Sequence, residues 1–96
     1  MAHFSINTRD PRQKFNVMLF GKIISWDMKK DIINMAETSV LSVNVLDGDG
    51  SVYICRFYGT RAEAFNKHLF KSEIFIEGKC AECMGRIIDV TTMSYR

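Results

Sequence analysis

Aromatic and basic side chains alternate in two short stretches of this sequence, a combination that can hold a flat ring and an anion together. "CRFY" places Arg56 and Tyr58 two residues apart, so on an extended backbone both project from one face. The second stretch, "KIISWDMKK", surrounds one aromatic ring with three lysines: Lys22, Trp26, Lys29 and Lys30. Rings stack on nucleobases and cations attract phosphates, so both stretches indicate the chemistry of binding a nucleic-acid strand.

Both stretches also have ordinary structural interpretations, which the sequence leaves open. Trp26 can be a partly buried anchor of the fold, and Lys29 and Lys30 are typical of a solvated loop. The net charge is only +2, but it is unevenly distributed. Residues 1–30 have six basic and two acidic side chains, whereas residues 31–50 have four acidic ones and no base. This distribution permits a basic face that attracts phosphate, and equally a mixed solvated surface.

Cys80 and Cys83 form the sequence "CAEC", whose spacing suits two thiolates on one zinc ion. A structural zinc site needs four ligands, and the other soft candidates, Cys55, His3 and His68, do not form a second pair. A redox CxxC needs a helix N-terminus to lower the pKa of its thiol, whereas this one falls in a predicted β-turn. We therefore predict two ordinary cysteines on a short hairpin, with no metal and no cofactor.

No catalytic constellation is recognisable in the sequence. The two histidines have no nucleophile beside them, no glycine-rich phosphate loop precedes a helix, and the carboxylates are scattered over turns and helix ends. We therefore do not expect an enzyme.

The spacing of the apolar residues predicts a chain that is mainly β. "FNVMLFGKIISW" (15–26) is rich in β-branched and aromatic residues and predicts a long strand that bends at Gly21. Residues 27–37 are polar and predict a loop, with a helical turn as the alternative. Three further segments predict a strand, a tight turn and a returning strand: "TSVLSVNVL" (38–46), "DGDG" (47–50) and "SVYICRFYG" (51–59).

A single helix is predicted to interrupt the strands. Thr60 with Glu63 three residues later is a capping-box pattern, and Ala62, Phe65 and Leu69 make one apolar stripe. Such a helix can lay one face over the open end of a barrel.

Two more strands are predicted after the helix, over 72–80 and 86–95. Five strands with one helix between the third and the fourth is the arrangement of the OB-fold, a small barrel that binds oligonucleotides or oligosaccharides across its second and third strands. We therefore predict a mainly β, five-stranded OB-fold barrel over residues 15–96, preceded over residues 1–14 by a flexible N-terminal arm or a short edge segment.

Two segments of the chain resemble the bacterial-type single-stranded DNA-binding proteins. "YGTRAEAFNKHLFKSEIFIEGK" (58–79) is similar to the family's aromatic-Gly-Lys-x-Ala-Glu block, short helix and Val-Tyr-Ile-Glu-Gly-basic strand. "FNVMLFGKI" (15–23) is similar to the family's first strand. Together the two segments cover about a third of the chain, in the family's order and spacing.

This resemblance implies sequence-tolerant binding of single-stranded DNA, in replication or recombination. By position, it implies that Tyr58 stacks on a base, that Arg56 lies on the same DNA-facing strand, and that Lys22 and Lys79 face the nucleic acid. The full set of predicted nucleic-acid-binding residues is Lys22, Trp26, Lys29, Lys30, Arg56, Tyr58, Lys79 and Arg86.

Two departures from the family narrow the expectation. The family's long hairpins shrink here to "DGDG" and "AECMG", so each subunit is expected to wrap less DNA. The sequence ends basic at Arg96, without the acidic tail that recruits replication and repair proteins, so no recruitment through such a tail is expected. These features are similar to those of short phage or plasmid single-strand binders, or of primosomal protein B relatives. A homo-oligomer, dimer or tetramer, is expected because a domain this small buries a modest core.

Two other classes of function remain open. An OB-fold adaptor that binds a replication or repair protein is favoured by the short hairpins and the low net charge. An RNA-binding module uses the same chemistry, and its choice of ligand rests on contacts to the 2′-hydroxyl. The polar start of the sequence and the lack of an apolar run of about 18 residues predict a cytoplasmic protein without a membrane partner. The resemblance implies that the cell is a bacterium or a phage-infected bacterium.

Overall fold

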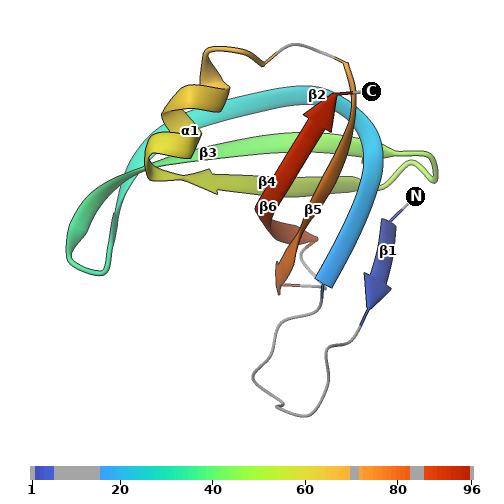
Figure 1. Cartoon of the computed structure of the whole chain (residues 1–96), viewed down its shortest axis with the longest axis horizontal. Helices are drawn as coiled ribbons and strands as arrows, with labels where there is room; N and C mark the ends of the chain where they lie inside the picture. Colours follow the sequence, from blue (N-terminus) through green and yellow to red (C-terminus); the bar gives the residue numbers. More distant parts are fainter. Residues whose placement is uncertain (1, 6–15, 70–71, 83–85, 96) are drawn as a thin grey trace.

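A single sheet contains nearly all of the regular structure in the computed structural model, which describes residues 2–5, 16–69, 72–82 and 86–95 (Figure 1). The strands are β1 (Ala2–Ser5), β2 (Asn16–Ile33), β3 (Ala36–Asp47), β4 (Val52–Tyr58), β5 (Glu73–Glu82) and β6 (Ile87–Tyr95). The one helix among the described residues is α1 (Gly59–Asn66), between β4 and β5. The prediction of a mainly β chain with one helix in this place is confirmed.

Five of the strands close into a ring. Their hydrogen-bonded neighbours run β2, β3, β4, β6, β5 and back to β2. Four of the five pairings are antiparallel, and the pairing of β4 with β6 is parallel. β1 pairs with the first residues of β2 and stands outside the ring. Part of the predicted N-terminal arm is therefore a strand, while residues 6–14 lie outside the described residues.

The long strand β2 closes the ring because it pairs with β5 in its first half and with β3 in its second half. The two pairings meet at Gly21, which is opposite Asp47 of β3 and Ile74 of β5. A Cβ atom at Gly21 would lie 2.5 Å from the carbonyl oxygen of Leu46, so the close approach of β3 requires glycine here. The predicted bend at Gly21 has this physical cause, and the register shifts shortly after it, between Ile23 and Ser25.

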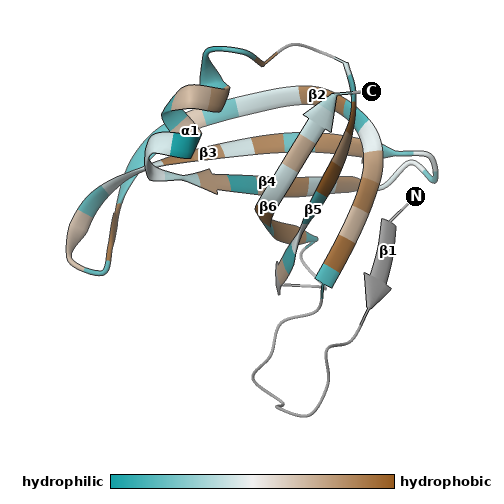
Figure 2. Cartoon of the chain, in the orientation of Figure 1, coloured by the Kyte–Doolittle hydropathy of each residue, from teal (hydrophilic) through white to brown (hydrophobic). Residues whose placement is uncertain are grey.

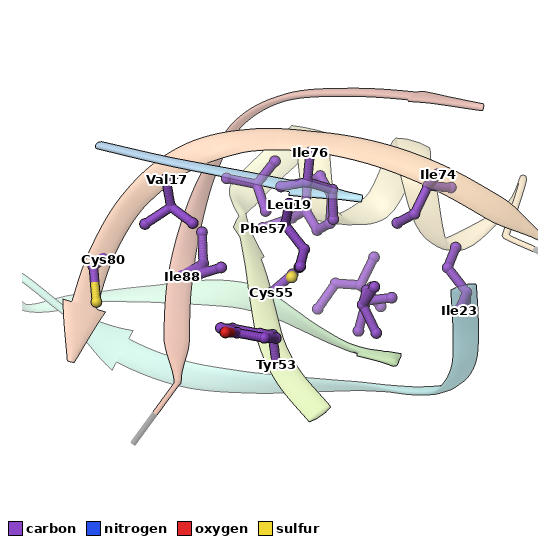
Figure 3. Packing of buried hydrophobic residues seen from close by; sticks show 14 of the residues in the cluster. Val17, Leu19, Ile23, Tyr53, Cys55, Phe57, Ile74, Ile76, Cys80 and Ile88 are labelled. Carbon is purple, nitrogen blue, oxygen red and sulfur yellow. The ribbon is translucent and has the colours of Figure 1, made fainter. Parts of the chain in front are cut away.

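Alternating side chains of the ring strands fill its interior. On β4, Tyr53, Cys55 and Phe57 are buried, whereas the residues between them are at least partly exposed. Figure 2 shows an alternation of hydropathy along β3, and Figure 3 shows the buried side chains meeting between the strands. The strand predictions for 38–46, 51–59, 72–80 and 86–95 are confirmed within two residues at each end. The predicted face assignment of β4 is also confirmed.

The prediction of a loop over residues 27–37 is wrong. These residues continue β2 and β3 as a two-stranded arm, which extends past the helix in Figure 1. Asn34 and Met35 form its tip with φ of 50° and 65°, the left-handed conformations of a two-residue hairpin turn. The polar composition that suggested a loop reflects the solvent on both sides of an arm that packs little against the core.

The predicted tight turn between β3 and β4 is confirmed. Asp47 Oδ1 accepts hydrogen bonds from the backbone N–H groups of Asp49 and Ser51, at 2.9 and 3.0 Å. Gly50 has a φ of 84°, a conformation that glycine adopts without strain. The turn thereby satisfies the carboxylate of Asp47, which is 6% exposed.

The helix packs one face against the ring, as predicted, but its N-terminus differs from the prediction. Ala62 is fully buried, and the ring of Phe65 lies 4.7 Å from that of Phe57, measured between centroids. The predicted capping box is wrong, because no side chain caps the helix. The carboxylate of Glu63 instead accepts a hydrogen bond from the Ser39 hydroxyl at 2.9 Å and so ties the helix to β3.

Within the described part of the chain, no helix has the length and the apolar content needed to cross a membrane.

Candidate nucleic-acid interface

The side chains that point away from the core form a continuous outer face across the ring. Directly opposite residues on neighbouring strands share a face, so the register places polar side chains in one row. This central row is Lys79 of β5, Asp89 of β6, Arg56 of β4, Ser42 of β3 and Asp27 of β2. All five side chains are at least partly exposed. Two of the predicted residues, Arg56 and Lys79, therefore lie on either side of one carboxylate.

Asp89 organises the centre of this row. Its Oδ1 atom accepts hydrogen bonds from Arg56 Nε at 3.1 Å, from Arg56 Nη2 at 3.0 Å and from the Tyr58 hydroxyl at 2.8 Å. The guanidinium carbon of Arg56 lies 5.7 Å from the centre of the Tyr58 ring, within range of a cation–π contact. The predicted pair of Arg56 and Tyr58 is thus held in a fixed arrangement, and its cation is already paired with an anion.

Burial, followed by the hydrogen bond and the negative charge of Asp89, raises the pKa of Tyr58 to about 12. Arg56 acts in the opposite direction and is outweighed. The phenol therefore stays protonated in the folded protein at pH values where an ordinary tyrosine, with a pKa of about 10, has ionised.

Tyr58 should make the stability of the fold depend on pH above pH 10. The unfolded chain releases the Tyr58 proton near pH 10 and the folded chain near pH 12, so the free energy of unfolding should fall as the pH rises through this window. Urea unfolding at pH 9, 10, 11 and 12 measures this fall. A Tyr58→Phe variant removes the contribution, so its decline should be shallower than that of the wild type. If the free energy of unfolding declines equally in both proteins, the pKa of Tyr58 is not raised in the folded state.

A depression of about 390 Å³ lies beside Arg56 and Tyr58 on the outer face. Its walls come from β2, β3, β4 and the start of β6: Lys29, Asp31, Ile33, Val40, Ser42, Ile54, Arg56, Tyr58 and Ile87. Three of the predicted residues, Lys29, Arg56 and Tyr58, thus converge on one hollow. Apolar side chains also line it: Ile33, Val40, Ile54 and Ile87. Lys29 reaches it because the arm continues β2 past the ring, and Lys29 is directly opposite Val40.

Trp26 and Lys30 lie on the other side of the sheet. Trp26 is opposite Val43, which is fully buried, and its half-buried ring packs against the core. This packing supports the interpretation of Trp26 as a partly buried anchor of the fold. It does not support the interpretation in which the Trp26 ring stacks on a base beside Tyr58. Lys30 is opposite Ser39 on the side of the helix, and its Nζ lies 3.8 Å from Glu37 Oε1 in an exposed ion pair.

Lys22 lies toward the turn between β3 and β4, whereas Arg86 directly precedes Ile87, which lines the Tyr58 hollow. Lys22 lines a separate depression of about 320 Å³ that also contains Asp47 and Glu73. Arg86 has a φ of 53°, and its carbonyl oxygen accepts a hydrogen bond from the Ile54 N–H at 2.8 Å. Burial raises the pKa of Tyr53, and the Arg86 guanidinium, which hydrogen-bonds its hydroxyl, partly opposes this. Lys22 is therefore in a different depression from Tyr58, and the guanidinium of Arg86 is engaged with Tyr53.

Sequence reasoning missed the residue that ties the site together. Asp89 is 33 positions after Arg56 and reaches it only because β6 pairs in parallel with β4. No spacing rule connects two residues across such a pairing. Asp31, Ile33 and Ile54, which line the hollow, were missed because part of the arm was taken for a loop and because an apolar residue on an outer face leaves no distinctive pattern.

The net charge of the chain is only +2. A strong overall attraction for phosphate is therefore not expected, and any binding must rest on local cations such as Lys29 and Arg56.

The cysteines differ from the sequence expectation. Cys80 is disulfide-bonded, and Cys55 is a buried thiol whose pKa is raised to about 12 by burial. An ordinary unpaired Cys80 is therefore a wrong prediction, while Cys83 lies outside the described residues. In the part of the chain that the structure describes, histidine, cysteine and carboxylate groups do not gather into a cluster that could hold a metal ion.

Comparison with known proteins does not identify the chain: no family model and no curated protein matches it.

Proposed function

We propose that the ring is an OB-fold. The support is its topology: five strands close a ring with one parallel pair, and a single helix between the third and fourth ring strands covers part of the interior. In that fold, ligands bind across the second and third strands and the loop between the first and second. Here these elements are β3, β4 and the arm formed by β2 and β3.

We propose that this protein binds single-stranded DNA without strong sequence preference, in replication or recombination, and performs no chemistry. The observation that carries the proposal is the convergence of the Tyr58 ring with Arg56 and Lys29 on one hollow of the outer face of β2–β4. A base stacks on the Tyr58 ring or packs on the apolar side chains that line the hollow beside it. Lys29 and Arg56 take the adjoining phosphates, and Lys79, on the other side of Asp89 in the central row, offers a further cation.

A titration of a fluorescently labelled oligo(dT) by anisotropy, at low and moderate salt, tests this function. We expect saturable binding whose affinity falls as salt rises, because phosphate contacts release counterions. Trp26 quenching is a poor signal, because the ring packs against the core. Absence of binding at low salt would remove this function from consideration. A parallel titration with oligo(rU) separates a DNA binder from an RNA binder, because the two ligands differ at the 2′-hydroxyl.

Lys29 and Lys30 offer a matched pair that tests which side of the sheet binds. The two lysines are adjacent and exposed, and they lie on opposite sides of β2. Lys29→Ala should weaken oligo(dT) binding and reduce the slope of log affinity against log salt by about 0.7, the value for one phosphate contact on a single strand. Lys30→Ala should leave the slope unchanged. Equal effects of both variants would contradict binding on the outer face.

A protein-binding adaptor is the second candidate, and the exposed tip of the arm favours it. Ile32 is 74% exposed and Met35 is 98% exposed, which is unusual for large apolar side chains on a projecting hairpin. The low net charge of +2 is also compatible with a protein ligand. Purification from cells with a raised 260/280 nm absorbance ratio supports the nucleic-acid binder, and a ratio typical of pure protein favours the adaptor.

A further inference from the structure

One carboxylate oxygen holds two of the proposed binding residues of the outer face, Arg56 and Tyr58. Asp89 Oδ1 accepts three hydrogen bonds, two from the guanidinium of Arg56 and one from the hydroxyl of Tyr58. These donors are the types that recognise an oxygen of a nucleic-acid phosphate, namely a charged guanidinium and a neutral hydroxyl. In this arrangement an anion of the protein itself occupies the place between them.

We infer that Asp89 is an internal substitute for a backbone phosphate, which a bound strand must displace from Arg56. The inference rests on the proposed single-strand binding. It assigns to Asp89 a role in setting affinity: the ion pair neutralises Arg56 in the unbound protein, and the strand competes with a carboxylate for the same donors.

The backbone fixes this competitor in place. Arg56 and Asp89 are directly paired residues of the parallel strands β4 and β6, so the carboxylate belongs to the ring. The two side chains keep 31% and 27% of their surface exposed. A phosphate in solution can therefore reach the guanidinium, which would be impossible for a fully buried pair. Partial exposure also means that the ion pair is weak enough to be exchanged.

The expected consequence is a binder of restrained affinity. A phosphate that replaces the carboxylate gains the donors of Arg56 and loses the energy of the existing ion pair, so the net gain is smaller than at an unpaired arginine. It also meets the negative charge of Asp89 at close range. Removal of that charge should therefore strengthen binding, although Asp89 makes contacts that order Arg56 and Tyr58.

The test compares Asp89→Asn with Asp27→Asn. Both variants remove one negative charge from the central row, but Asp27 makes none of the hydrogen bonds to Arg56 or Tyr58. Asparagine keeps the size of the side chain and an oxygen acceptor. We expect Asp89→Asn to bind labelled oligo(dT) about three- to ten-fold more tightly than the wild type at low salt, with a salt slope steeper by about 0.7. Asp27→Asn should gain less than about two-fold, with the slope unchanged.

The outcomes separate this inference from the proposed function. If the wild type binds and Asp89→Asn binds no more tightly than Asp27→Asn, the inference is wrong. Weaker binding by Asp89→Asn would make Asp89 a positioning residue for Arg56 and Tyr58. Tighter binding by Asp89→Asn alone supports both ideas, including when the wild type is too weak to measure. If no variant binds at low salt, the proposed function itself fails.

A measurement on the wild type covers the case in which Asp89→Asn does not fold. The Arg56 Nε–H group, which donates to Asp89, gives its own signal in a ¹H–¹⁵N spectrum, assigned by its loss in Arg56→Lys. Addition of oligo(dT) should shift this signal in proportion to the bound fraction, because the acceptor changes from carboxylate to phosphate. A signal that stays in place at saturation would show that the pair with Asp89 persists in the complex and would overturn the inference.

Discussion

Gly78→Ala should destabilise the fold by more than about 3 kcal/mol, the largest effect that we expect from removing or adding one methyl group. A Cβ atom at Gly78 would lie 2.4 Å from the carbonyl oxygen of Asp89 and 2.9 Å from Ile88 Cγ2. The first contact is with backbone, which cannot rotate away, so β5 and β6 must separate where their register already shifts. Urea unfolding followed by circular dichroism measures the loss.

Gly48→Ala is the matched control for this prediction. Gly48 lies in the turn between β3 and β4, a Cβ atom there meets nothing within 4 Å, and its φ is not positive. We expect its free energy of unfolding to stay within about 0.5 kcal/mol of the wild type. A Gly78→Ala protein as stable as Gly48→Ala would show that β5 and β6 can spread at no cost, contrary to the packing described above.

The same close approaches account for two glycines of the segments that were predicted to resemble single-stranded DNA-binding proteins. These are Gly21 and Gly78, the two described glycines where a Cβ atom would strike the backbone of a neighbouring strand. At Gly59, the third glycine of these segments, a Cβ atom would meet nothing within 4 Å. Gly21 and Gly78 are therefore required by the closure of a small ring. A motif with this cause supports a fold, and it does not by itself indicate a ligand.

Elements whose residues face the core could be predicted from the sequence, because burial imposes the alternation of apolar and polar residues. β3 and β4 were located within two residues by this pattern, and the turn at Asp47 by its glycines and carboxylates. The arm could not be located in the same way. Its side chains gain little from burial, so only cross-strand hydrogen bonds and the turn at Asn34 and Met35 define it.

The candidate site was predicted in part. The face to which a side chain points follows from the two-residue period of a strand, but the sequence does not show which strands become neighbours in the sheet. Alternation on β4 correctly placed Arg56 and Tyr58 on one face. The extension of β2 into the arm put Lys29 beside them and Lys30 behind the sheet, which a loop assignment could not distinguish. Asp89 depended on the closure of the ring, a property of the whole chain.

Tyr58→Ala should weaken oligo(dT) binding by about five- to 150-fold, which corresponds to about 1–3 kcal/mol for one stacked base. The salt slope should stay at its wild-type value, because no charge is removed. Titrations at three or more salt concentrations give both quantities. Thermal unfolding of the variant must be measured alongside, because the half-buried Tyr58 ring also hydrogen-bonds Asp89 at the outer face.

Tyr58→Phe distinguishes the ring from its hydroxyl. Phenylalanine keeps the π surface and loses the hydrogen bond to Asp89, so a stacking role predicts an affinity within about three-fold of the wild type. If Tyr58→Phe instead loses as much affinity as Tyr58→Ala, the hydroxyl is the important group, and Tyr58 acts by holding Asp89 and Arg56 in place. If neither variant changes the affinity, the strand does not bind at this hollow. The exposed tip of the arm, with Ile32 and Met35, then becomes the next surface to test.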